Sequence, residues 1–194
     1  FVVANLSNSN LLDRTDLSNV NLAGTDLSNV SLKGTNLSSA ILTGTDLTGA
    51  ILTGADLTGT ILARANLTGA ILKDVDLSGK DLSYTILKDV DLSGIDLSGS
   101  NFFYTDLRLS DLSGTILSDS ILFRTNLSKI DLRTAKLDNV DFRFALLSES
   151  KFPDSPLVDN NFDFAHLKNI NFAGKDLSGS SFDQAKFAGS DMQN

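Results

Sequence analysis

The sequence contains no cysteine and no tryptophan, and only two prolines and one histidine among its 194 residues. Without cysteine the chain has neither a disulfide framework nor a thiolate metal site. A single histidine excludes a site with two histidine ligands and disfavours histidine-based catalytic relays. No apolar run approaches the ~20 residues that span a bilayer, which predicts no membrane insertion. Together with the lack of cysteine, this favours a cytoplasmic location.

Basic residues are also scarce, since 16 lysines and arginines stand against 24 acids and give a net charge of −8. This balance argues against direct nucleic-acid binding. The glycines recur singly rather than as a phosphate-binding loop, and His166 is expected to be an exposed surface residue. Aspartates twenty residues apart would lie ~5 Å from each other on adjacent coils, as in a glycosidase, but on a flat ladder without a pocket. We therefore expect no enzymatic activity, no cofactor and no metal.

A repeat of five residues dominates what is present. Leucine, phenylalanine or methionine occupies every fifth position from Leu12 to Met192 without exception. With this central residue called i, position i−2 is alanine, serine, threonine or valine in 30 of 36 repeats. Position i−1 is often aspartate or asparagine, and position i+2 is often glycine.

A period of five fits neither regular secondary structure. On an α-helix the leucines would wind around the whole surface, and on a straight strand they would alternate between two faces. They can share one interior only if the chain turns a corner in every repeat. Residues i−2 and i then point inward together while i−1 points outward. The period therefore predicts a solenoid of short β segments.

Units such as Thr25-Asp26-Leu27-Ser28-Asn29 resemble those of the pentapeptide-repeat family, whose pattern is A(D/N)LXX, over about 180 of the 194 residues. The resemblance implies an all-β fold, a right-handed quadrilateral β-helix with four pentapeptides per 20-residue coil. Residues 15–194 would then form a single domain of about nine coils. Because the phase slips by one residue near Leu12, residues 1–14 are expected to form an irregular N-terminal coil.

A few inward positions break the pattern. Lys80 and Lys175 occupy position i−2, and so does Asn160. A lysine cannot be buried unpaired in so narrow a core, so we expect its stem to leave through a local backbone distortion. Pro153 and Pro156 cannot donate to the ladder of hydrogen bonds, which predicts weaker pairing and a kink near residues 153–160.

Aromatic side chains outside the central positions gather on one face. Seven exist, and six fall on the same one of four faces when positions are sorted by twenty. Exposed aromatics and arginines are typical of interaction hot spots. A stacking ladder that only stiffens the rod is the alternative. The chain is thus predicted to be a non-enzymatic protein-binding or scaffold module, with self-association as one form of that binding. The residues predicted to bind protein are Arg64, Tyr84, Phe103, Tyr104, Phe123, Arg124, Arg143, Phe144 and Phe164.

A second face carries eight aspartates and one outward base, for a net charge of −7. The family resemblance implies an alternative function here, because some pentapeptide-repeat proteins resemble B-form DNA and protect type II topoisomerases. In this alternative the chain is a DNA mimic that binds gyrase and inhibits or protects it. Such aspartates also satisfy backbone groups at the corners of the repeat. The acids of the alternative site are Asp56, Asp76, Asp96, Asp119, Asp138, Asp159 and Asp176.

Overall fold

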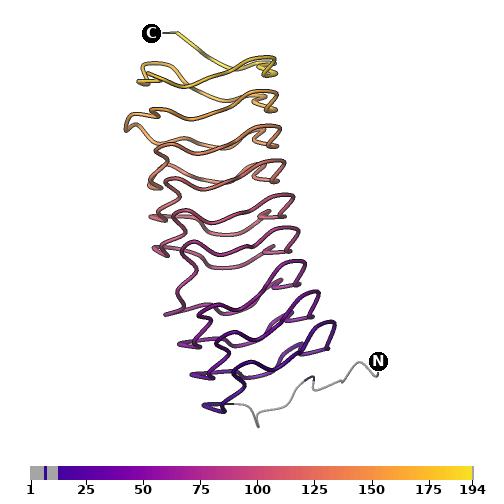
Figure 1. Ribbon diagram of the computed structural model, residues 1–194. Coiled ribbons are helices and arrows are strands. Elements are labelled where there is room, and N and C mark those ends of the chain that lie inside the picture. The colour runs from indigo at the N-terminus through magenta and orange to yellow at the C-terminus, as the bar shows by residue number, and fades with distance from the viewer. Residues whose placement is uncertain (1–6, 8–12, 194) are drawn as a thin grey trace.

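The structure is a computed structural model that describes residue 7 and residues 13–193. These residues form a tall stack of similar coils, which rises from residue 13 at one end to residue 193 at the other (Figure 1). Most of the predicted irregular coil over residues 1–14 lies outside the described residues.

Parallel bridges between residues twenty apart hold the stack together. They run from Asp16↔Asn36 at one end to Asn171↔Asp191 at the other. Each bridge is a single pair, and the described residues contain no helix and no strand longer than one bridge. The coil length of twenty residues and the all-β architecture are therefore as predicted, with each β segment reduced to the residue at position i−1.

Most corners are tight turns. The N–H of Thr25 donates to the carbonyl oxygen of Leu22 at 3.0 Å, and the same bond from i+3 to i recurs along the rod. Within this turn, residue i+2 has a positive φ, as at Gly24 with 67°. Glycine adopts this left-handed conformation without strain. Twenty non-glycine residues adopt it as well, all of them at i+2.

The core is a continuous column of central residues, from Leu27 to Phe172, whose side chains are almost fully buried. Phenylalanines replace leucine toward the C-terminal end and stack on each other, with 4.8 Å between the ring centroids of Phe142 and Phe162. Inward threonines and serines satisfy their hydroxyl groups by donating to a backbone carbonyl. Thr45, for example, donates to Leu22 O at 2.8 Å.

The hydrogen-bond ladder between coils opens at specific inward residues. We call the residues at position i−2 inward residues. Where the ladder is intact, the N–H of the residue after an inward residue donates to the carbonyl oxygen of the inward residue one coil earlier, as Ile86 N–H does to Ala65 O at 3.0 Å. Among the described residues this bond is missing after every inward lysine and isoleucine. These are Lys80, Ile95, Ile130, Ile170 and Lys175. Since most other inward residues are smaller, we attribute each opening to a side chain too large or too polar for the interior.

The same bond is absent at three further positions. Pro156, which follows Ser155, has no N–H to donate. The other two positions follow Val75 and Val90, which lie beside the openings at Lys80 and Ile95. The ladder is therefore interrupted at Pro156, as the sequence predicts. The kink at residues 153–160 stays a prediction.

The two inward lysines find different partners. The ammonium group of Lys175 reaches Pro153 O at 2.6 Å and Asp154 Oδ1 at 2.9 Å. The ammonium group is therefore paired, and the exit of the stem through a backbone distortion stays a prediction. Lys80 is half-buried and acts electrostatically on Asp56 and Asp76. The third polar inward residue, Asn160, is buried and accepts a hydrogen bond from Val140 N–H at 2.9 Å.

Candidate interaction surface

One column of corners carries large side chains where glycine would fit best. Gly24 and Gly44 begin the column, and both have a positive φ. The following corners keep that conformation, with φ between 56° and 66°, although none of them is glycine. A left-handed backbone costs roughly 1 kcal/mol for a residue with a Cβ atom, so these side chains are present despite local strain. The corners are Arg64, Tyr84, Tyr104, Arg124, Phe144 and Phe164.

The aromatic rings of this column and its neighbour form one stacked series. Tyr84 and Tyr104 lie parallel, with 5.5 Å between centroids and 4° between planes. The series continues from Phe103 to Phe123 at 5.4 Å, and from Phe123 to Phe144 at 5.1 Å. It ends with Phe144 and Phe164, which stack at 4.6 Å and 1°. Such ring separations and geometries are favourable for aromatic pairs.

Three arginines complete the series. The guanidinium of Arg124 lies 5.3 Å from the ring centroid of Tyr104 and 5.1 Å from that of Phe144, and it donates a hydrogen bond to the Tyr104 hydroxyl. Arg64 lies 5.1 Å from the centroid of Tyr84, and Arg143 lies 5.4 Å from that of Phe123. These are cation–π distances. We call these nine residues, from Arg64 to Phe164, the aromatic strip.

Much of the aromatic strip faces solvent. Tyr84 and Tyr104 are 46% and 43% exposed, while the four phenylalanines are half-buried against their neighbours. Ile61 and Ile121, on the same face, are exposed by 47% and 42% and extend the apolar surface. The rings therefore stabilise one another and still leave a wide apolar and cationic surface uncovered. The structure thus brings the nine predicted residues together on one face.

The acidic face is arranged differently, because its carboxylates turn back to their own corners. Asp56 accepts a hydrogen bond from Thr58 N–H at 2.9 Å, and Asp76 accepts one from Ser78 N–H at 2.9 Å. The pKa of Asp56 and of Asp76 is lowered, first by the side-chain hydrogen bond from Thr58 or Ser78, then by the backbone bond, and further by nearby Lys80.

The other predicted acids follow the same pattern or pair with a neighbour. Asp96 and Asp176 each accept a hydrogen bond from the backbone N–H two residues on. Asp119 accepts a hydrogen bond from Asn139 Nδ2 at 2.7 Å. Asp138 is exposed near Ser118 Oγ, and Asp159 is exposed at its corner. The face is acidic, and much of its hydrogen-bonding capacity is already used within the rod.

The described part of the chain can also be compared with the requirements of a metal site and of a membrane span. No cluster of three or more histidine, cysteine, aspartate or glutamate side chains with metal-binding geometry occurs there. His166 Nε2 lies 3.4 Å from the ammonium nitrogen of Lys186 rather than beside a nucleophile. The described residues also include no helix of the length and apolarity needed to cross a bilayer.

The family of the chain follows from its repeats. A family model for pentapeptide repeats matches it in eight copies, over residues 2–38, 15–54, 40–79, 50–89, 81–119, 122–154 and 161–194. The chain belongs to the pentapeptide-repeat family. A comparison with curated protein sequences finds no match. The right-handed quadrilateral β-helix predicted from the resemblance is therefore the fold of this pentapeptide-repeat protein.

Solved structures agree with this fold. HetL from the cyanobacterium Nostoc sp. strain PCC 7120, a pentapeptide-repeat protein involved in the regulation of heterocyst differentiation, is 28% identical. The match covers 97% of this chain and 89% of HetL, with a TM-score of 0.50. A trypsin-treated variant of QnrB1, a plasmid-mediated fluoroquinolone resistance protein, is 18% identical with a TM-score of 0.59, over 92% of this chain and 90% of that chain. At that identity the likeness to QnrB1 shows the fold alone.

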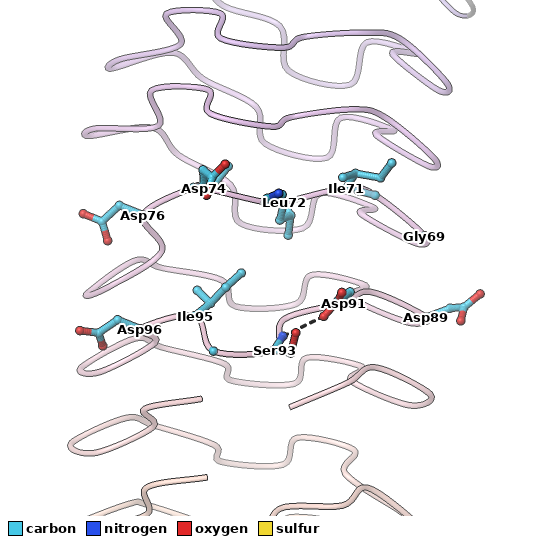
Figure 2. Close-up of a pocket in the computed structure, with 14 residues that line it drawn as sticks. Gly69, Ile71, Leu72, Asp74, Asp76, Asp89, Asp91, Ser93, Ile95 and Asp96 are labelled. Atoms are coloured by element: carbon cyan, nitrogen blue, oxygen red, sulfur yellow. Dashed lines mark hydrogen bonds between the residues drawn. The ribbon is translucent and has the colours of Figure 1, made fainter. Parts of the chain in front are cut away.

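One feature outside the aromatic strip was not predicted from the sequence, an opening between two coils. We call it the seam, and it lies between residues 69–76 and residues 89–96 (Figure 2). The lining residues enclose a cavity of about 1060 Å³. Ile95 lies in a column of mostly small inward residues, but as an ordinary apolar residue it did not by itself mark the opening.

Proposed function

We propose that this pentapeptide-repeat protein is a non-enzymatic interaction module that binds a protein partner through the aromatic strip. The observation that carries the proposal is the exposure of Tyr84 and Tyr104 within a continuous series of rings and arginines. Tyrosine and arginine are enriched among residues that dominate the binding energy of protein interfaces.

The strip differs from the other corners in its side chains. Its corner residues share their left-handed conformation with non-glycine residues elsewhere on the rod, such as Asn19 and Lys129, so the backbone does not distinguish them. They are distinguished by a run of aromatic and arginine side chains in one column, in which Tyr84 and Tyr104 are 46% and 43% exposed.

The rigidity of the rod suits such a role. The rings stack on their neighbours from one coil to the next, so their rotamers are already restricted before a partner arrives. Binding then loses less conformational entropy than it would with free side chains. The surface also extends over successive coils, from Tyr84 to Phe164, which fits another protein better than a small ligand.

The acidic face supports the alternative, a DNA mimic that acts on gyrase, less well. Its carboxylates accept hydrogen bonds from their own corners, as Asp56 and Asp76 do. Lys80 further reduces the negative potential around these two carboxylates. A supercoiling assay with purified gyrase tests this alternative, and no effect at micromolar protein would exclude it.

A matched pair of variants tests the aromatic strip. Tyr104→Ser with Phe123→Ser removes two rings from its centre, and Leu109→Ser with Leu146→Ser removes two apolar side chains from another face, where they are 70% and 37% exposed. The protein and any partner that co-purifies with it are measured by sedimentation and by titration of the purified components.

We expect the first pair to weaken partner binding or self-association by tenfold or more, because hot-spot rings contribute ~2 kcal/mol each. The second pair should leave both unchanged. Equal behaviour of the two pairs, with both folded, would overturn the proposal.

A further inference from the structure

The seam leaves unpaired backbone groups on both of its walls. In the next coil, Leu92 N–H donates to Asp111 O at 2.9 Å, and Asp111 N–H donates to Val90 O at 3.0 Å. At the seam, Leu72 N–H makes no hydrogen bond to Asp91 O, and Asp91 N–H makes none to Ala70 O. Asp74 N–H and Leu77 N–H also lack the bond that their counterparts make to the following coil. Two edges of a β ladder therefore face each other across a cavity.

The cavity is large enough for a polypeptide segment and is lined by both apolar and polar residues. Its volume of about 1060 Å³ is at the upper end of the range for ligand pockets, which is roughly 300–1,000 Å³. On one wall Ile95 is only partly buried, whereas Leu72 on the other wall belongs to the core and is 1% exposed (Figure 2). The side chain of Ile71 is 48% exposed beside the opening. An occupant could thus bury apolar side chains while its backbone pairs with the walls.

The charge of the lining decides which segment fits. Five aspartates and a single lysine line the seam. Asp76 and Asp96 stand at one end of the opening, and Asp89 stands at the other (Figure 2). Since Ser78 and Ser98 hydrogen-bond to Asp76 and Asp96 and lower their pKa, these carboxylates stay ionised at neutral pH. The lining residues are Gly69, Ala70, Ile71, Leu72, Lys73, Asp74, Val75, Asp76, Asp89, Asp91, Ser93, Gly94, Ile95 and Asp96.

We propose that the seam binds an extended segment of a protein partner that carries lysine or arginine. The segment completes the open ladder with its own N–H and C=O groups, places alternate apolar side chains against Ile71 and Ile95, and directs its cationic side chains to the aspartates. Addition of a strand to an open edge is a common mode of peptide recognition. The seam lies away from the aromatic strip, so this proposal is independent of the proposed function.

A fluorescent hexapeptide in which lysine alternates with valine is the probe. It is titrated into the full chain, and the backbone amides of the protein are followed by hydrogen exchange. We expect saturable binding that weakens with salt, and slower exchange at Leu72, Asp74 and Asp91. The same peptide with N-methylated backbone at alternate residues should bind at least tenfold more weakly, because it cannot complete the ladder.

The control peptides make the test decisive. Replacing lysine by glutamate should abolish binding if the aspartates select the charge. No binding of the lysine peptide, or equal binding of its N-methylated form, would overturn the proposal. Equal binding of the glutamate peptide would overturn it as well.

Variants of the protein test the location. Lys80→Thr with Ile95→Thr restores small inward residues, so it should close the seam, protect the amide of Asp96 and weaken peptide binding at least tenfold. Ile130→Thr, at a different opening, should leave binding unchanged. Tyr104→Ser with Phe123→Ser should also leave it unchanged, which separates the seam from the aromatic strip. A folded double variant with a closed seam and undiminished binding would overturn the proposal.

Discussion

The ammonium group of Lys175 donates a hydrogen bond to the backbone carbonyl of Pro153, at 2.6 Å, from a side chain that is only 8% exposed. The two residues lie on adjacent coils. No backbone N–H among the described residues donates to Pro153 O, so the lysine, which is too polar for the core, supplies the donor that this carbonyl lacks.

This relationship predicts the effect of removing the charge. Lys175→Met keeps the length of the side chain but leaves Pro153 O without its donor. We expect a loss of about 1–2 kcal/mol in the free energy of unfolding, since the bond is charge-assisted and nearly buried. Thermal unfolding should detect this as a lower midpoint. Lys168→Met, at an exposed lysine, should change the midpoint little, and an equal effect of both substitutions would contradict the assignment.

The ladder openings predict which backbone amides exchange fast. Asp131 N–H follows Ile130 and has no partner on the preceding coil, whereas Asp141 N–H donates to Ser120 O at 3.0 Å. Native-state hydrogen exchange should therefore be much faster at Asp131 than at Asp141. Ile130→Ala should slow the exchange at Asp131, because a small inward residue lets the coils approach. Similar protection of the two amides in the unsubstituted protein would contradict the opening.

The corner carboxylates predict a difference between two substitutions at one site. Asp46 accepts hydrogen bonds from Thr48 N–H at 3.0 Å and from Thr48 Oγ1 at 2.6 Å. Asp46→Ala should lower the free energy of unfolding by about 1 kcal/mol, as the loss of a helix cap does. Asp46→Asn should be nearly neutral, because Asn66 makes the same two bonds to Thr68. Chemical denaturation of both variants measures the difference.

The ion pairs predict a loss of stability in acid. The hydrogen bond from Arg133 lowers the pKa of Asp131 to about 2, with further help from the charges of Arg133 and Lys151. A carboxyl group whose pKa is lowered by folding stabilises the folded state above its unfolded pKa of about 3.9. This stabilisation disappears as the pH falls from about 4 to about 2. The effect is small, since the side chains of Arg133 and Asp131 are 61% and 42% exposed.

Arg133→Gln isolates this contribution. The midpoint of thermal unfolding should be lower than that of the unsubstituted protein at pH 6, and the difference should shrink near pH 2. A difference that stays constant over this range would mean that the pair does not contribute through the charge of Asp131.

Much of the fold could be predicted from the sequence because every fifth residue is a large apolar residue of the core. The unbroken series from Leu12 to Met192 predicts a solenoid, and the gathering of aromatics at intervals of twenty predicts the coil. The stack of Tyr84 on Tyr104 and the bridge between Ile41 and Ile61 confirm that spacing. Handedness came from the family resemblance, because period and spacing are the same in a mirror-image path.

The seam could not be predicted in the same way. The charge of Lys80 marked one irregular position, but Ile95, Ile130 and Ile170 are ordinary apolar residues. An oversized inward residue can be accommodated by a rotamer change, by a neighbour of smaller volume or by separation of the coils. Which of these occurs depends on packing across residues twenty apart, and only the three-dimensional structure shows that coil separation prevails here. The aromatic strip, by contrast, follows from position alone.

The openings also have a mechanical consequence. Each coil of a solenoid is coupled only to its neighbours, so tension applied along the axis is carried by every junction in series. The junction beside Lys80 and Ile95 carries fewer hydrogen bonds than those around it. We therefore expect the described part of the rod to yield there first and to part into two shorter rods whose stacked cores remain intact. A single inward lysine and a single isoleucine would thus set where the described coils separate.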